Sequence, residues 1–177
     1  MSEYKKIESA LISVFYKDGL EELVRELNHQ NVRIYSTGGT LTFIRELGIE
    51  AISIEEITHF PEILGGRVKT LHPGVFGGIL HRRNNPSDVE TIKKHNISSI
   101  DLVVVDLYPF EEAVQLKLEE EEIIEKIDIG GISLIRAAAK NFEDVTVIAS
   151  RNHYEHFTML FHEQQGKLSL AQRRFFA

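Results

Sequence analysis

Asp101-Leu102-Val103-Val104-Val105-Asp106 is the stretch that decides the fold. Four consecutive apolar residues lie between two aspartates, and three of the four are valines. An uninterrupted apolar run of this length is typical of a strand that is buried on both faces of a parallel sheet. The stretch therefore predicts an α/β protein, in which helices cover the two faces of one sheet.

Strand-like and helix-like segments alternate on both sides of this stretch. Apolar residues at helical spacing and N-cap or glycine signals mark the helices, whereas short β-branched runs mark the strands. The predicted strands are 10–15, 32–35, 51–54, 102–105 and 145–148. The predicted helices are 20–27 behind an N-cap at Asp18, 40–47, 86–95, 119–126, 132–140, 152–165 and 170–176, and segment 55–81 is predicted to be rich in loops. This order predicts an open, mostly parallel sheet with right-handed crossovers.

Composition limits the possible functions. The 177 residues are enough for one domain with a sizeable core, and the net charge is −7. The chain has no cysteine, which excludes disulfides, thiolate zinc sites and cysteine nucleophiles. The spacing of His72 and His81 fits no zinc motif, so no metal site is expected. No signal peptide and no apolar run of about 18–20 residues is present, so we expect a cytoplasmic protein.

Gly-Gly-Arg-Val-Lys-Thr-Leu-His-Pro at 65–73 is the most unusual loop. Arg67, Lys69, Thr70 and His72 lie within six positions, and five of the chain's 12 glycines fall within the 14 residues from 65 to 78. Glycine permits a close approach of the backbone to a ligand. A concentrated basic loop on an acidic protein favours a pocket for a small anion over a surface for nucleic acid.

Tyr35-Ser36-Thr37-Gly38-Gly39-Thr40 follows a predicted strand and opens a predicted helix. Unpaired N–H groups and the positive end of a helix dipole make such a place suitable for phosphate. The loop is neither a dinucleotide fingerprint nor a Walker A loop, because no lysine follows the glycines. A tight strand-to-helix turn with a threonine cap explains the same residues equally well.

Four further residues have both a chemical and a structural explanation. Lys17 lies at the end of the first strand, where ligands of open α/β sheets bind, but it also suits a solvated surface. Tyr108 can contact a heterocycle or simply pack before Pro109. Asp128 can act on a substrate or cap a helix. Lys140 can stabilise a negative charge or lie favourably at a helix C-terminus.

Taken together, these loops resemble one protein family. ALISVFYKDGL, YSTGGT, GGRVKTLHPGVFGGIL, DLVVVDLYPF and EKIDIGGISLIRAAAKN follow one another between about residues 9 and 150. The same order is seen in the N-terminal cyclohydrolase domain of the bifunctional purine-biosynthesis enzymes that carry AICAR transformylase and IMP cyclohydrolase activities. YSTGGT is shared more widely, with methylglyoxal synthase and with the allosteric domain of carbamoyl phosphate synthetase.

The resemblance implies a methylglyoxal-synthase-like three-layer sandwich that closes the ring of formyl-AICAR to give IMP, without cofactor or metal. It implies a small purine ribonucleotide as partner, no nucleic acid or membrane, and a homodimer for the full-length protein. Two alternatives of the same fold remain: a methylglyoxal-synthase-like lyase and a regulatory nucleotide-binding module without chemistry.

The family pattern also implies roles for individual residues. Implied to hold the 5′-phosphate are Ser13, Lys17, Thr37, Gly38, Gly39, Thr40 and Thr70. Implied to line the rest of the nucleotide site are Phe15, Tyr16, Arg67, Val68, Val105, Asp106 and Ile129. Implied to carry the chemistry are Lys69, Tyr108, Asp128 and Lys140. Within that group we expect Lys140 to stabilise charge on the formyl oxygen. Lys69, Tyr108 and Asp128 are expected to move protons.

The sequence departs from the family pattern at three places. Phe15 and Tyr16 stand where the family has serine and aspartate, so side-chain contacts to the substrate from this loop are in question. Asp106 stands where the family has asparagine, and a carboxylate only accepts hydrogen bonds. Gly74 stands where the family commonly has lysine.

The last predicted helix stops after Phe175 and Phe176. We therefore expect residues 1–177 to be a single domain of a longer bifunctional chain, with both phenylalanines exposed at the cut. Formyl transfer to AICAR is expected only of the full-length protein.

Overall fold

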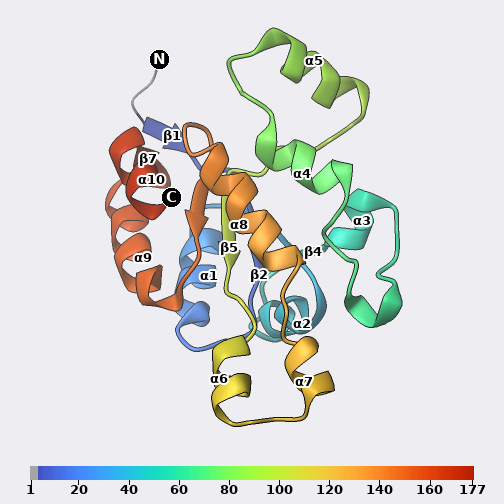
Figure 1. Cartoon of the computed structure of the whole chain (residues 1–177). Helices are drawn as coiled ribbons and strands as arrows, with labels where there is room; N and C mark the ends of the chain where they lie inside the picture. Colours follow the sequence, from blue (N-terminus) through green and yellow to red (C-terminus); the bar gives the residue numbers. More distant parts are fainter. Residues whose placement is uncertain (1–3) are drawn as a thin grey trace.

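A computed structural model describes residues 4–177, and its centre is a five-stranded parallel sheet (Figure 1). The strand order is β4-β3-β2-β5-β6, so β2 lies in the middle between β3 and β5. The strands are β2 (Ser9–Ser13), β3 (Arg33–Ser36), β4 (Ile52–Ser53), β5 (Leu102–Val105) and β6 (Thr146–Ile148). In the register, Leu11 pairs with Tyr35 on one side and with Val103 on the other. The predicted α/β fold with a parallel sheet is confirmed.

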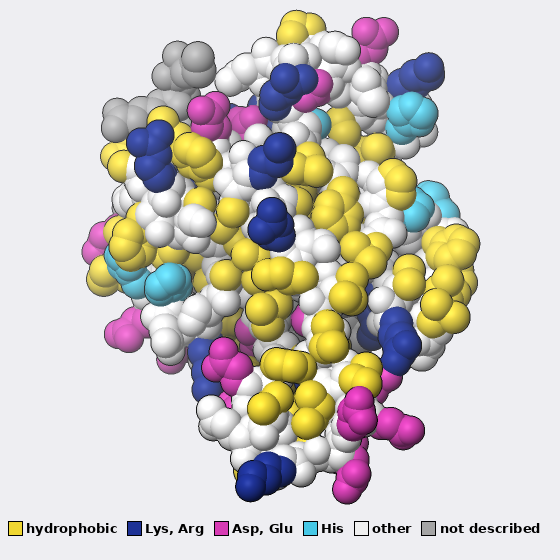
Figure 2. All heavy atoms as spheres, in the orientation of Figure 1, with side chains coloured by type: hydrophobic (Ala, Val, Ile, Leu, Met, Phe, Trp, Pro, Cys, Tyr) yellow, Lys and Arg dark blue, Asp and Glu magenta, His cyan; other side chains and the backbone are white. Residues whose placement is uncertain are grey.

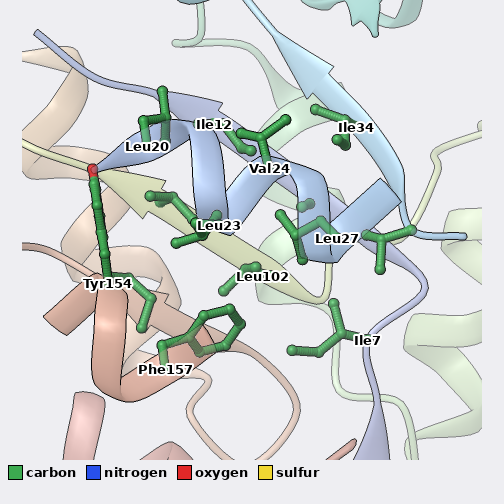
Figure 3. Close-up of a cluster of buried hydrophobic side chains, with 14 of the residues drawn as sticks. Ile7, Ile12, Leu20, Leu23, Val24, Leu27, Ile34, Leu102, Tyr154 and Phe157 are labelled. Atoms are coloured by element: carbon green, nitrogen blue, oxygen red, sulfur yellow. The ribbon is translucent and has the colours of Figure 1, made fainter. Parts of the chain in front are cut away.

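Side chains of the central strands alternate between two separate cores. Ile12 and Val104 point to the core that is covered by α1 (Leu20–His29), α2 (Gly38–Glu46), α9 (Tyr154–Glu163) and α10 (Leu170–Phe176). Leu11 and Val103 point to the core under α3 (Ile54–Thr58), α4 (Pro73–Leu80) and α8 (Gly130–Lys140). Figure 3 shows the first core, where the apolar stripe of α1 meets Tyr154 and Phe157 of α9.

The remaining elements are short and lie at the periphery. They are β1 (Tyr4–Lys6), which pairs antiparallel with β7 (Lys167–Ser169), and the helices α5 (Pro86–Lys94), α6 (Phe110–Gln115), α7 (Glu120–Ile124), η1 (Leu64–Gly66) and η2 (Arg151–His153). Among the described residues, no helix is long and apolar enough to cross a membrane.

Four details differ from the sequence-based expectation. The N-cap of α1 is Gly19 in the left-handed region (φ 73°), rather than Asp18. Segment 55–81, predicted to be rich in loops, holds most of α3 and all of α4, which were not predicted. The small sheet of β1 and β7 and helix α6 were not predicted either, because elements of three to six residues have little periodicity of their own. Finally, Phe175 is exposed as expected, but Phe176 is only 6% exposed and packs against Phe157.

Candidate active site

A large cavity opens where β2, β3 and β5 end, at the carboxyl edge of the sheet. Its volume is about 760 Å³, within the range of small-molecule sites. Five segments line it: the loop after β2, the start of α2, residues 65–71, the β5–α6 connection, and residues 124–134 from α7 into α8. In Figure 1 this region lies around α2, α6 and α7. Ligands of open α/β sheets bind at this edge.

One end of the cavity is the N-terminus of α2. Ser36 donates a hydrogen bond from Oγ to the carbonyl of Ile12 over 2.7 Å. The hydroxyl of Thr40 accepts from the N–H of Val14 (3.1 Å) and donates to its carbonyl (2.9 Å). These buried contacts tie the loop between β3 and α2 to β2, so the Thr40 hydroxyl is not available to a ligand. The first-turn N–H groups of the helix have no partner within it, and Gly38, Gly39 and Thr40 line the cavity, so this end is suited to an anion.

Lys69 lies between two glycines at this end of the cavity. A Cβ atom on Gly66 would lie 2.7 Å from its Cε atom, and one on Gly38 would lie 3.4 Å from its Nζ atom. Gly38 also adopts a left-handed conformation (φ 54°), which favours glycine. The ammonium pairs with Glu62 over 3.0 Å, and the side chain is 27% exposed. The two glycines therefore make room for a lysine beside the α2 N-terminus.

A second helix N-terminus, that of α8, faces the same cavity. Thr70 is 6% exposed, and its Oγ1 atom lies 3.3 Å from the position that a Cβ on Gly130 would occupy. Gly131 donates its N–H to Oδ1 of Asp128 over 2.6 Å. Asp128 therefore caps the helix in part, although the backbone N-cap is Ile129.

Asp128 and Tyr108 form the other end of the cavity. Burial raises the pKa of the Asp128 carboxyl, while hydrogen bonds from the backbone of Gly131 and Tyr108 oppose the rise. A carboxyl group with a raised pKa is protonated over more of the pH range, so it can donate as well as accept a proton. Tyr108 is 42% exposed and offers its phenol to a ligand.

Phe15 adds an aromatic wall beside Tyr108. The two rings are 5.5 Å apart between centroids and stand at 88° to each other. The ammonium of Lys126 lies 5.8 Å from the centre of the Phe15 ring, within cation–π range. Phe15, Tyr108 and Lys126 all line the cavity. This end therefore combines an aromatic surface, a cation and an acid.

Asp106 holds the loop after β2 in place. Its carboxylate accepts hydrogen bonds from the N–H groups of Phe15 and Tyr16, the latter over 3.0 Å. Lys17 donates from Nζ to the carbonyls of Val14 (2.5 Å) and Phe15 (3.0 Å). Burial lowers the pKa of Lys17, and the charge of Asp106 opposes this. A carboxylate has two acceptor oxygens, one for each of these backbone donors. This gives a structural reason for Asp106 at the position where the family pattern has asparagine.

Arg67 and Glu125 form an ion pair between the 65–71 segment and the end of α7. Both side chains are more than half exposed, and both line the cavity. The charge of Glu125 raises the pKa of Arg67, mainly through their hydrogen bond. An anionic ligand that enters here competes with Glu125 for the guanidinium.

The structure brings most of the expected residues together. Of the expected set, the cavity lining contains Ser13, Phe15, Lys17, Thr37, Gly38, Gly39, Thr40, Arg67, Lys69, Thr70, Val105, Asp106, Tyr108, Asp128 and Ile129. Three expected residues do not line it: Tyr16, Val68 and Lys140.

Each of the three has another position. The Tyr16 hydroxyl bonds Glu112 over 3.1 Å, and its ring lies under the guanidinium of Arg151. Val68 forms an isolated antiparallel bridge with Ile63. Lys140 is exposed in the last turn of α8, whose first turn faces the cavity. Eleven residues of helix extend over roughly 16 Å, so the expectation that Lys140 meets Lys69 at the strand ends is not supported by the structure.

Eleven lining residues were outside the set assigned from the sequence. They are Val14, Gly65, Gly66, Leu71, Ile124, Glu125, Lys126, Ile127, Gly130, Gly131 and Leu134. The two glycine pairs could have been recognised in the sequence, since paired glycines are typical of places where the backbone comes close to a ligand or another segment. The residues of α7 carried no such signal, because an acidic helical stretch looks like any solvated surface. His72 proves to be structural: its Nδ1 accepts from the N–H of Gly74 and caps α4.

A family model described as the MGS-like domain matches residues 19–133. The chain belongs to the MGS-like domain family. The matched segment includes the α2 loop, the 65–71 segment and the Asp128 corner, so it covers most of the cavity. The expected methylglyoxal-synthase-like fold is confirmed.

Relatives with known names agree with this membership. The chain is 52% identical over 177 residues to "Bifunctional purine biosynthesis protein PurH" of Bacteroides thetaiotaomicron, covering 100% of this chain and 35% of that protein. It is 47% identical over 165 residues to the protein of the same name in Ligilactobacillus salivarius, covering 93% and 32%. The chain thus spans about a third of the length of these relatives.

A solved structure confirms the fold. The structure titled "Crystal structure of ForH" superimposes with a TM-score of 0.82 at 32% identity and covers 95% of this chain and 86% of that one. The family match and the identity to PurH confirm, at the level of homology, the resemblance to the N-terminal domain of bifunctional purine-biosynthesis enzymes.

Proposed function

We propose that this MGS-like domain is an IMP cyclohydrolase, which closes the ring of formyl-AICAR to give IMP with loss of water. One observation carries the proposal: the N-terminus of α2 and Lys69 face one end of a cavity whose other end holds Tyr108, Asp128 and the Phe15 ring. A ribonucleotide would place its phosphate at the first end and its heterocycle at the second. Homology to PurH supports a substrate from purine biosynthesis.

In this proposal the 5′-phosphate binds at the first turn of α2. Backbone N–H groups of Gly38, Gly39 and Thr40 supply the donors, and Lys69 supplies the charge. Binding an anion there draws the Lys69 ammonium away from Glu62, which holds it in the free protein. Thr70 and Ser13 complete the polar wall.

The imidazole ring and its two amide arms then lie against Phe15 and Tyr108. In the reaction, the carboxamide nitrogen forms a bond to the formyl carbon, and the formyl oxygen leaves as water. That water takes one proton from the carboxamide and one from the formamide nitrogen. Amide nitrogen is a poor nucleophile, so holding the two arms in contact is a large part of the catalysis.

The residues at this end supply the proton transfers. Asp128 accepts a proton from the attacking amide and returns one to the departing oxygen, a double role that its raised pKa favours. The phenol of Tyr108 donates to the formyl oxygen as it gains charge. The ammonium of Lys126 lies at the same end and stabilises that charge. No step is assigned to Lys140, whose position in the fold is on the outer end of α8.

The deciding experiment supplies the purified chain with formyl-AICAR and follows IMP formation. Turnover to IMP is expected. Dihydroxyacetone phosphate is the second substrate to offer: methylglyoxal formation in place of IMP would identify a lyase. Tight binding of IMP without turnover of either compound would identify a regulatory nucleotide-binding module.

We further propose that residues 1–177 form one domain of a bifunctional protein that is a homodimer at full length. In this proposal the cavity serves ring closure, and formyl transfer from 10-formyltetrahydrofolate to AICAR belongs to the rest of the full-length protein. Formylation of AICAR by the purified chain would contradict this division of labour.

A further inference from the structure

Two histidines and a glutamate lie together where α1 packs against α9, away from the cavity. They are Glu26 and His29 in the last turns of α1 and His162 near the end of α9. One ligand atom from each lies within 4.8 Å of the other two. Oε1 of Glu26 is 3.1 Å from Nδ1 of His162 and 3.8 Å from Nδ1 of His29.

These separations are close to those of a tetrahedral metal site. Zinc bonds to nitrogen and oxygen of about 2.0–2.1 Å place neighbouring ligand atoms roughly 3.3 Å apart. The two imidazoles are 71% and 65% exposed, so they can turn toward a common ion without disturbing the core. The rings are already nearly parallel, at 26°.

The surroundings of the cluster also favour a cation. The Glu26 side chain is only 15% exposed, and the amide of Gln30 donates to its Oε1 over 2.9 Å. A hydrogen bond of this kind orients a metal-binding carboxylate. Helix α1 ends at His29 and α9 ends at Glu163, so two negative helix ends meet here.

We propose that Glu26, His29 and His162 bind a divalent transition-metal ion such as Zn²⁺, which bridges α1 and α9. Two imidazole nitrogens select zinc, nickel, cobalt or copper over magnesium and calcium, which prefer oxygen ligands. The fourth position is open to water. The cavity loop enters α1 at its other end, about 13 Å away along the helix, so the ion stabilises packing and takes no part in ring closure.

The sequence could not indicate this site. Glu26 and His162 are separated by 136 positions, and only the packing of the two helices brings them together. The expectation of no metal site rested on the spacing of other histidines. This proposal is independent of the proposed enzymatic activity.

The test uses the chain without a histidine tag, stripped of metal by a chelator. Zn²⁺ binding is measured by calorimetry, and Co²⁺ is added separately because a tetrahedral cobalt site shows strong visible absorption. One ion per chain is expected. His29→Ala and His162→Ala should each weaken binding at least tenfold, whereas His95→Ala, an exposed histidine outside the cluster, should leave it unchanged.

A second measurement tests the bridge itself. Zn²⁺ should raise the melting temperature of the wild type and of His95→Ala, but not that of the doubly substituted His29→Ala, His162→Ala chain. Circular dichroism confirms that each variant is folded. Absence of stoichiometric binding, or equal affinity of the double variant and the wild type, would overturn the proposal, because the ion would then be bound adventitiously or not at all.

Discussion

The two ends of the cavity are built differently. At the α2 end, Ser36 and Thr40 are 0% and 3% exposed, and their hydroxyls bind the backbone of Ile12 in β2 and of Val14 just after it. At the α8 end, Tyr108, Ile127 and Ile129 are 42%, 52% and 57% exposed and lie on the connections between short helices. Figure 2 shows apolar side chains gathered on the face that carries α6, α7 and the start of α8. The α2 end is therefore anchored in the buried core, whereas the α8 end lies at the protein surface.

Under the proposed function, this difference separates binding from chemistry. A backbone site attached to the sheet would recognise the phosphate whatever the rest of the ligand is, and the exposed end would select the heterocycle and carry out the reaction. Substitutions at the two ends should therefore have different effects on kcat, on KM and on the affinities for a nucleotide and its nucleoside.

Asp128→Asn should have the largest effect. The amide oxygen can still accept from the N–H of Gly131, so the start of α8 is kept, but the group no longer transfers protons. We expect kcat for formyl-AICAR to fall about 10²–10⁴-fold, with KM within about threefold of the wild type. Turnover within fivefold of the wild type would remove Asp128 from the mechanism.

Lys69→Met, at the α2 end of the cavity, should have the second largest effect. Methionine keeps the length of the side chain but loses its charge. We expect kcat/KM to fall about 10²-fold, and IMP to bind much more weakly while inosine binds almost as before. Lys93→Met, on the exposed helix α5, serves as the matched control. A loss of inosine affinity as large as that of IMP would show that Lys69 does not act on the phosphate.

Gly38→Val and Gly48→Val form a matched pair at the two ends of α2. Both glycines have positive φ, 54° and 75°, so both substitutions strain the backbone. Only the first places a side chain in the cavity, next to Lys69. We expect Gly38→Val to weaken all 5′-monophosphates roughly tenfold or more in calorimetry, with little change for nucleosides. If Gly48→Val has the same effect, strain rather than phosphate contact is the cause.

Phe15→Ser should have a smaller effect, and one that does not depend on the phosphate. It removes the ring beside Tyr108 and restores the serine of the family pattern. An aromatic contact contributes about 0.5–1.5 kcal/mol, so IMP and inosine should both bind roughly two- to tenfold more weakly. Phe15→Tyr should retain the affinity. A loss confined to the nucleotide would place Phe15 at the phosphate instead.

The smallest effect concerns stability. Burial raises the pKa of Asp128 in the folded chain, so its contribution to stability is present below the unfolded pKa and is lost as pH rises through the folded pKa. The amide of Asp128→Asn does not titrate, so the variant does not lose stability as pH rises through this pKa. The melting temperature of the variant relative to the wild type should therefore be higher at pH 7.5 than at pH 4. The opposite trend would mean that the carboxylate, not the acid, is the form that the fold favours.

The sequence by itself determined the parallel sheet and two segments of the cavity wall. The apolar run at 102–105 and the alternation around it predicted the five parallel strands, because burial on two faces leaves a pattern that local residues carry. Paired glycines in the 35–40 and 65–73 segments predicted two of the segments that line the cavity. Both signals are local, so they can be read without the fold.

Tertiary structure alone decided which distant groups meet. The length of α8 separates Lys140 from Asp128, although both belong to one motif in the sequence. Conversely, packing of α1 on α9 brings His162 to Glu26, and the end of β5 brings Asp106 to the backbone of Phe15. Such meetings depend on helix directions and on long-range register. No single segment of the chain contains that information.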